Sequence, residues 1–86
     1  MTDKWQKLRD VLHTELIFPS EYIFKFIVPV DRLVEATTLL TDARITTKAS
    51  KTGKYISITA YKVMISADEI ISVYQRMAVI EGLMSL

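Results

Sequence analysis

The sequence predicts an α+β fold in which two helices cover one face of a four-stranded antiparallel sheet. Three observations carry this prediction. Glu21–Val28 has the period of two of a strand, two later segments have apolar residues at helical spacing, and a single turn signal, Lys51–Lys54, lies between those segments. A chain of 86 residues, 50% of them hydrophobic, can bury one core but not two.

A short N-terminal helix is expected first. Trp5, Leu8 and Leu12 follow one another at spacings of three and four residues, which puts them on one helix face. Asp3 is of a type that caps helices, and we expect the helix to run from there to about Leu12. Pro19 stops it, because a proline ring cannot continue a helix and restricts the preceding residue to extended conformations.

The first strand, Glu21–Val28, has two different sides. The side expected to face the core consists of Tyr22, Phe24, Phe26 and Val28. The other side consists of Ile23, Lys25 and Ile27. After Pro29, apolar residues at helical spacing predict the first core helix, from Asp31 to about Thr41.

A hairpin and a second core helix follow. Ala43–Ser50 and Tyr55 to about Val63 are predicted to pair as antiparallel strands around a turn at Gly53. Ser66–Glu69 matches a capping box, so a helix starts there. Its apolar stripe is Ile70, Val73, Tyr74, Met77 and Ile80.

Gly82 is expected to end this helix in a left-handed conformation, and Leu83–Leu86 is the last predicted strand. Two strand–helix–strand units of this kind form the ferredoxin-like βαββαβ two-layer sandwich. We therefore expect an N-terminal helical extension over residues 1–15 and a ferredoxin-like domain over 16–86. Its dry interior should hold Phe24, Phe26, Leu33, Ile58 and Val73.

The composition speaks against several function classes. The chain has no cysteine, one histidine and a net charge of +1, so cysteine-ligated metals, histidine-built metal sites and global attraction to nucleic acid are not expected. No apolar run approaches the roughly 18 residues of a membrane span, and no secretory signal precedes the domain, so we expect a cytoplasmic protein. His13 suits a helix C-terminus, and Asp68 with Glu69 suits a helix N-terminus. We expect no catalytic residues, no cofactor and no metal.

The chain also resembles the small bacterial YbeD-like proteins, often labelled lipoate regulatory protein-like. The resemblance spans roughly Leu16 to Leu86. The residues that carry it are Phe18-Pro19, Tyr22, Phe24-Lys25-Phe26, the turn Ser50-Lys51-Thr52-Gly53-Lys54-Tyr55, Ser57-Ile58-Thr59 and Val73-Tyr74. It implies a ferredoxin-like domain similar to the amino-acid-sensing regulatory domains of metabolic enzymes, and it supplies no catalytic residues.

One departure from that family affects a small-ligand site. Family members commonly have glycine just after the first strand, where regulatory domains of this shape let a ligand approach backbone amides. This chain has Val28-Pro29-Val30 instead, and proline removes one donor. We therefore do not expect a small-ligand site at that loop.

The hairpin is unusually basic, since no acidic residue occurs between Arg44 and Ala67. Its cations are Arg44, Lys48, Lys51, Lys54 and Lys62. They could contact an acidic partner or nucleic-acid phosphates, or they could be solvated lysines that protect an edge strand from aggregation. RNA-binding domains of this fold need aromatic residues at exposed positions of the central strands, where this chain offers only Tyr61.

The sheet face away from the helices is expected to carry an apolar strip of Ile23, Ile27, Tyr61, Met84 and Leu86. The N-terminal helix, a second copy in a symmetric homodimer, or another protein could cover it. We expect a non-enzymatic regulatory or protein-interaction module that binds a metabolic enzyme or a small effector through this face or the basic hairpin. The alternative is a nucleic-acid-binding module that uses the hairpin.

Overall fold

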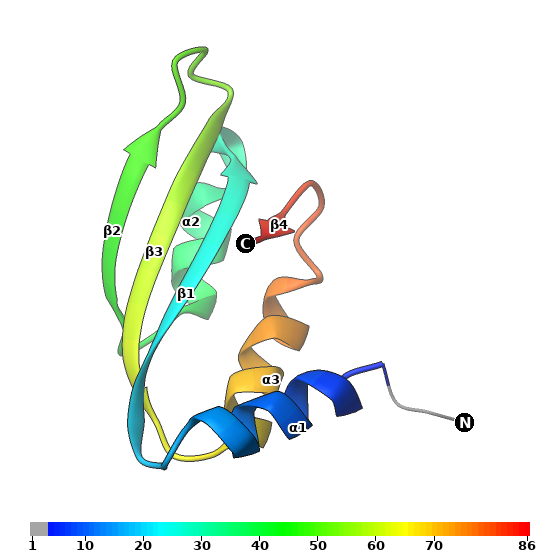
Figure 1. Ribbon diagram of the computed structural model, residues 1–86. Coiled ribbons are helices and arrows are strands. Elements are labelled where there is room, and N and C mark those ends of the chain that lie inside the picture. Colours follow the sequence, from blue (N-terminus) through cyan, green and yellow to red (C-terminus); the bar gives the residue numbers. More distant parts are fainter. Residues whose placement is uncertain (1–3) are drawn as a thin grey trace.

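The computed structural model describes residues 4–86 and shows one antiparallel sheet with helices packed against one of its faces (Figure 1). The strands are β1 (Ser20–Pro29), β2 (Arg44–Ala49), β3 (Tyr55–Met64) and β4 (Met84–Ser85). The helices are α1 (Gln6–Glu15), α2 (Leu33–Leu39) and α3 (Ala67–Met77), and a 3₁₀ turn, η1 (Val30–Arg32), precedes α2. The predicted cap of α1, Asp3, lies outside the described residues.

The strand order confirms the ferredoxin-like prediction. The sheet runs β2-β3-β1-β4, and β1 is antiparallel to both β3 and β4. Because β2 is also antiparallel to β3, the two strands joined through α2 are parallel to each other, as are the two joined through α3. This is the arrangement expected of two interleaved strand–helix–strand units.

The first core helix is shorter than predicted, because it is divided between η1 and α2. The hydroxyls of Thr37 and Thr38 both donate to the Val34 carbonyl, at 3.2 and 2.7 Å. Side-chain bonds of this kind compete with the main-chain ladder of a helix. α2 ends soon afterwards, at Leu39.

The prediction that Gly82 ends α3 is wrong. The helix ends at Met77, and tighter turns follow, in which the Ile80 amide donates to the Met77 carbonyl at 3.1 Å and the Leu83 amide to the Ile80 carbonyl at 3.3 Å. The start of α3 is as predicted: the Glu69 amide donates to Ser66 Oγ at 3.0 Å. Gly82, with φ +83°, turns the chain into β4.

The core lies between the sheet and the two helices α2 and α3. Four of the five residues predicted for the dry interior are buried, and the fifth, Leu33, is partly buried against them. The largest fully buried side chains are Phe24, Phe26, Val28, Ile58, Met64, Ile70 and Met77. The period-two pattern of the strands therefore predicted the correct core face.

An aromatic cluster around Tyr74 fastens α1 to α3 and β1. Tyr74 lies edge-on to Phe24 and Phe26, stacks on Trp5 with ring centroids 6.3 Å apart, and shares a 2.9 Å hydrogen bond between hydroxyls with Tyr22. Leu12 is buried in the same core, and an exposed ion pair joins Arg9 of α1 to Asp68 of α3 at 2.7 Å. The N-terminal helix therefore packs on α3.

Two glycines with positive φ allow a matched test of the packing between β1 and the last turn. A Cβ added to Gly82 would lie 2.8 Å from Pro29 Cγ, whereas one added to Gly53 (φ +73°) meets nothing within 4 Å. We expect Gly53→Ala to lower the free energy of unfolding by about 1 kcal/mol through backbone strain alone.

Gly82→Ala should cost roughly 1 kcal/mol more than Gly53→Ala, because the overlap adds to the strain. Urea denaturation followed by circular dichroism measures both. In a Pro29→Ala background the two substitutions should cost about the same. Equal losses in the wild-type background would contradict the contact between Gly82 and Pro29.

Tyr74 should make stability sensitive to alkaline pH. Burial, and then its hydrogen bond with Tyr22, raise the pKa of Tyr74 above its ordinary value of 10.0. A pKa that is higher in the folded state means that the stabilisation is complete below about pH 10. It is lost as the pH rises beyond that value, where the unfolded chain ionises first.

Wild-type unfolding free energy should therefore fall more steeply than that of Tyr74→Phe between about pH 10 and pH 12. The difference is at most about 1.4 kcal/mol per pH unit, and is less because the Tyr74 side chain is partly exposed and screened. Urea titrations at several pH values give the slopes, with Tyr55→Phe at the exposed hairpin as control. Identical slopes for wild type and Tyr74→Phe would show that the cluster does not bury this hydroxyl.

Candidate functional site

The sheet face opposite the core, called the open face below, is organised by the strand register into three rows. The rows are Ile23–Tyr61–Arg44, then Lys25–Thr59–Thr46, then Met84–Ile27–Ser57–Lys48. Leu86 completes the second row, since its amide donates to the Lys25 carbonyl at 2.9 Å. Residues paired across neighbouring strands point to the same side of a sheet. The register thus brings all five residues of the predicted apolar strip onto one face.

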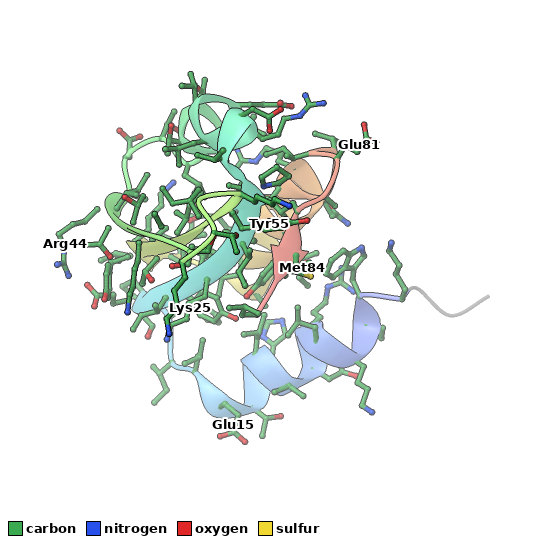
Figure 2. All side chains as sticks on the ribbon, turned by 90° about the horizontal axis from the view of Figure 1, so that it is seen from above. Glu15, Lys25, Arg44, Tyr55, Glu81 and Met84 are labelled. Atoms are coloured by element: carbon green, nitrogen blue, oxygen red, sulfur yellow. The ribbon has the colours of Figure 1, made fainter. Side chains whose placement is uncertain are left out.

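A lysine divides that strip. Lys25 lies between Ile23 and Ile27 on β1, and its side chain projects from the sheet in Figure 2. Four of the apolar residues therefore form two patches, Ile23 with Tyr61 and Ile27 with Met84, on either side of the row that holds Lys25 and Leu86. The sequence already indicates this, because Lys25 lies on the same side of the strand as Ile23 and Ile27.

Arg44 is attached to the open face by Tyr61. Its guanidinium lies 4.2 Å from the centre of the Tyr61 ring, which is a cation–π contact. The contact orients a cation at the outer edge of the sheet. It also covers one face of the Tyr61 ring, so Tyr61 offers less surface for stacking a base. The central strands present a second aromatic ring on this side, Tyr55 of β3, which has the same parity as Tyr61.

The five predicted basic residues do not form one surface. Arg44 and Lys48 lie on the open face, Lys51 and Lys54 lie in the β2–β3 turn, and Lys62 lies on the opposite side of the sheet, where the register pairs it with Tyr22. Its side chain therefore points to the same side of the sheet as the buried residues of β3. The apparent cluster in the sequence is therefore split between two faces.

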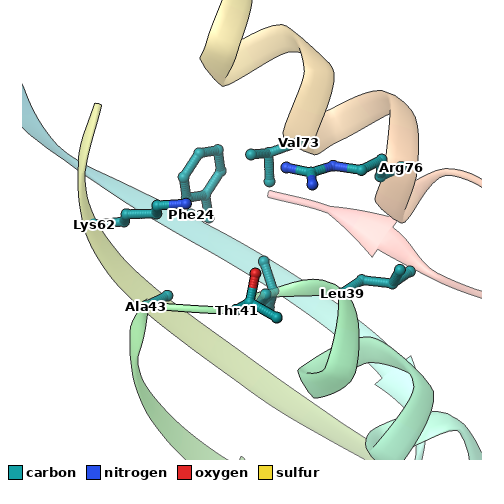
Figure 3. Close-up of a pocket in the computed structure, with 8 residues that line it drawn as sticks. Phe24, Leu39, Thr41, Ala43, Lys62, Val73 and Arg76 are labelled. Carbon is teal, nitrogen blue, oxygen red and sulfur yellow. The ribbon is translucent and has the colours of Figure 1, made fainter. Parts of the chain in front are cut away.

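Lys62 instead lines a small cavity between the sheet and the helices (Figure 3). Lys62 from β3 and Arg76 from α3 extend toward its mouth, and Phe24 and Val73 form part of its wall. The cavity has a volume of about 10 Å³, which is no more than one water molecule needs. It cannot hold an organic ligand.

A larger depression, called the turn pocket below, lies where the open face meets the hairpin turn. It has a volume of about 260 Å³. The open face contributes Ile27, Lys48 and Ser57, and the hairpin contributes Ala49, Ser50, Lys51 and Tyr55. The pocket therefore joins one residue of the predicted apolar strip to two of the predicted basic residues, and Ala49, Ser50 and Ser57 were not foreseen as site residues.

Hydrogen bonds fix the positions of the polar residues that line the turn pocket. The Tyr55 amide donates to Ser50 Oγ at 3.2 Å, and the Gly53 amide donates to the Ser50 carbonyl at 3.0 Å. Ser57 Oγ donates to the Lys48 carbonyl at 3.2 Å. These bonds link the turn to β2 and β3, so the pocket is lined by a part of the hairpin that hydrogen bonds hold in place.

The loop after β1 offers no free amide at its first two residues. Pro29 has no N–H, and the Val30 amide donates to the Lys54 carbonyl at 3.0 Å. The Pro29 ring also packs against the backbone of Gly82. A ligand therefore cannot approach the amides of residues 29 and 30 at this loop.

The residues considered for catalysis lie apart from the turn pocket. His13 is exposed near the end of α1, and Asp68 and Glu69 begin α3, where Asp68 pairs with Arg9. Within residues 4–86 there is no group of three or more histidine, cysteine, aspartate or glutamate side chains placed to hold a metal ion. No helix in the same range is both long and apolar enough to span a bilayer.

The fold and the open face define a small ferredoxin-like α+β domain without catalytic features among its described residues. A family model described as a protein of unknown function, DUF493, matches residues 13–86. The chain therefore belongs to the DUF493 family, which confirms the YbeD-like resemblance. Neither curated proteins nor solved structures yield a match. The boundary predicted between residues 15 and 16 stays a prediction.

Proposed function

We propose that this protein is a non-enzymatic regulatory module that binds another protein through its open face. The observation that supports this most is the position of α1. Its apolar side is used against α3, while Ile23, Met84 and Leu86 on the open face keep exposed fractions of 48%, 53% and 69%. Apolar patches that a small domain leaves in water commonly mark interaction sites.

The charge of the open face indicates the chemistry of the partner. The three rows contain Lys25, Arg44 and Lys48 and no acidic side chain, and the first acid on that side of β1, Glu21, lies beyond them. An acidic protein surface, such as that of a metabolic enzyme, would be steered toward this face and held by its apolar patches.

A second copy of the chain fits the same face less well. Two-fold pairing would bring the cations of two copies together, and like charges across an interface are unfavourable. The symmetric homodimer, the small effector and the cytoplasmic location expected from the sequence stay predictions.

Ile23→Asp should abolish partner binding without unfolding the domain. The change places a carboxylate in an apolar patch that the partner would have to desolvate, so we expect at least a tenfold loss of affinity. A partner is first isolated from native extract with wild-type protein, and its purified form is then titrated by calorimetry.

Val34→Asp is the matched control, because Val34 has an exposed fraction of 77% on α2, away from the open face. It should leave the titration unchanged. If both variants lose affinity alike, or if neither does, the open face is not the docking surface.

Nucleic-acid binding is the second candidate, favoured by the lack of acids around Arg44, Lys48, Lys51 and Lys54. The cation–π contact on Tyr61 weighs against a base-stacking mode. Salt separates the two functions, because phosphate contacts release counterions and apolar contacts do not. We expect affinity for the protein partner to fall between 50 and 200 mM salt, because its steering is screened, but far less steeply than the roughly 10³-fold or greater loss of a complex with many phosphate contacts.

Charge reversal of Lys51 and Lys54 together should weaken an RNA or DNA complex by more than tenfold. It should have a smaller effect on the protein complex, because both lysines lie in the turn and not in the three rows of the open face. Filter binding with a single-stranded oligonucleotide tests this. Submicromolar, steeply salt-dependent binding that the double variant loses would favour the nucleic-acid function.

A further inference from the structure

We infer that the turn pocket binds a small organic anion, a carboxylate with an apolar body. This site shares Ile27, Lys48 and Ser57 with the open face, but the inference does not depend on the proposed docking role of that face. The inference rests on three properties of the pocket: the two unpaired cations at its wall, its apolar lining, and its size.

The charge of the pocket is uncompensated. Lys48 and Lys51 line it, and neither ammonium group has an ion-pair or hydrogen-bond partner among residues 4–86. No acidic residue contributes to the lining. Two exposed lysines at a concave surface without a neighbouring acid produce a local positive potential, which favours an anion.

The lysines are also the only charged donors in the lining of the pocket. Ser57 Oγ already donates to the Lys48 carbonyl, and Ser50 Oγ is engaged by the Tyr55 amide and by Thr52 Oγ1 at 3.3 Å. Ammonium groups act as point charges without the fixed fork of arginine. Recognition therefore depends on the charge of the ligand more than on a bidentate geometry.

The rest of the pocket favours a hydrocarbon or an aromatic ring. Ile27 and Ala49 line it, and the ring of Tyr55, with an exposed fraction of 44%, stands beside them. Burial of these groups against an apolar ligand adds a favourable term that an inorganic anion cannot supply.

The volume limits the ligand to a small acid. The pocket of about 260 Å³ lies below the roughly 300–1,000 Å³ of pockets that enclose drug-sized ligands. An aryl or short alkyl carboxylate has that size, whereas a nucleotide is too large. The pocket is open to solvent, so we expect a dissociation constant in the millimolar to upper micromolar range.

Phenylacetate is the probe, titrated into uniformly ¹⁵N-labelled full-length protein and followed by amide chemical shifts. Shifts within residues 48–57 should saturate. Two controls should each bind at least fivefold more weakly than phenylacetate. The neutral isostere 2-phenylethanol lacks the negative charge, and acetate lacks the aromatic ring.

The turn supplies its own matched control. Lys48→Met and Lys51→Met should each weaken phenylacetate binding by about two- to fivefold, whereas Lys54→Met, in the same turn but outside the lining, should leave it unchanged. Equal losses in all three variants would mean non-specific charge attraction and would overturn the inference. So would 2-phenylethanol binding as tightly as phenylacetate, or no saturation up to about 50 mM.

Ile23→Asp distinguishes this inference from the proposed function. Ile23 lies two rows from the pocket, so its substitution should leave phenylacetate binding intact while it removes partner binding. Loss of phenylacetate binding in Ile23→Asp, with the fold retained, would show that the probe occupies the apolar patch and not the turn pocket.

Discussion

The arrangement of this domain depends on the aromatic cluster around Tyr74. A ring on α3 that touches Trp5, Tyr22, Phe24 and Phe26 joins the N-terminal helix, the central strand and the last helix in one contact network. Aromatic pairs of this geometry add to simple area burial. The apolar side of α1 is buried against α3. It therefore does not cover the opposite face of the sheet, whose apolar patches stay exposed.

The sheet register then determines what that face can do. Alternate residues of β2 and β3 point to opposite sides, so Arg44 and Lys48 join Ile23, Ile27 and Met84 on the open face. The result is a surface with apolar patches and an excess of positive charge. This charge is the reason why we propose acidic partners and small organic acids, and not a copy of the chain, for this surface.

The periodicities of the sequence predicted the elements, their order and the core face, because each is a local property of the chain. Lys62 shows where the prediction of a basic cluster failed. It is close in sequence to the other cations, but its side chain lies on the same side of β3 as Ile58, beneath the helices. The alternation of residues along this strand was already visible in the sequence. The docking of α1 could not be predicted, since an amphipathic stripe shows which side of a helix is buried but not against which partner. The turn pocket could not be predicted either, because it combines residues from β1, β2, β3 and the turn.

The accessibility of the open face is tested most directly by thiol labelling, because the native chain has no cysteine. Single variants Ile23→Cys, Val34→Cys and Ala60→Cys would be alkylated under native conditions, with the last a fully buried reference. We predict that Ile23→Cys reacts within about tenfold of the exposed Val34→Cys and far faster than Ala60→Cys. Protection of Ile23→Cys to the level of Ala60→Cys would contradict it, because the face would then be covered by the protein itself.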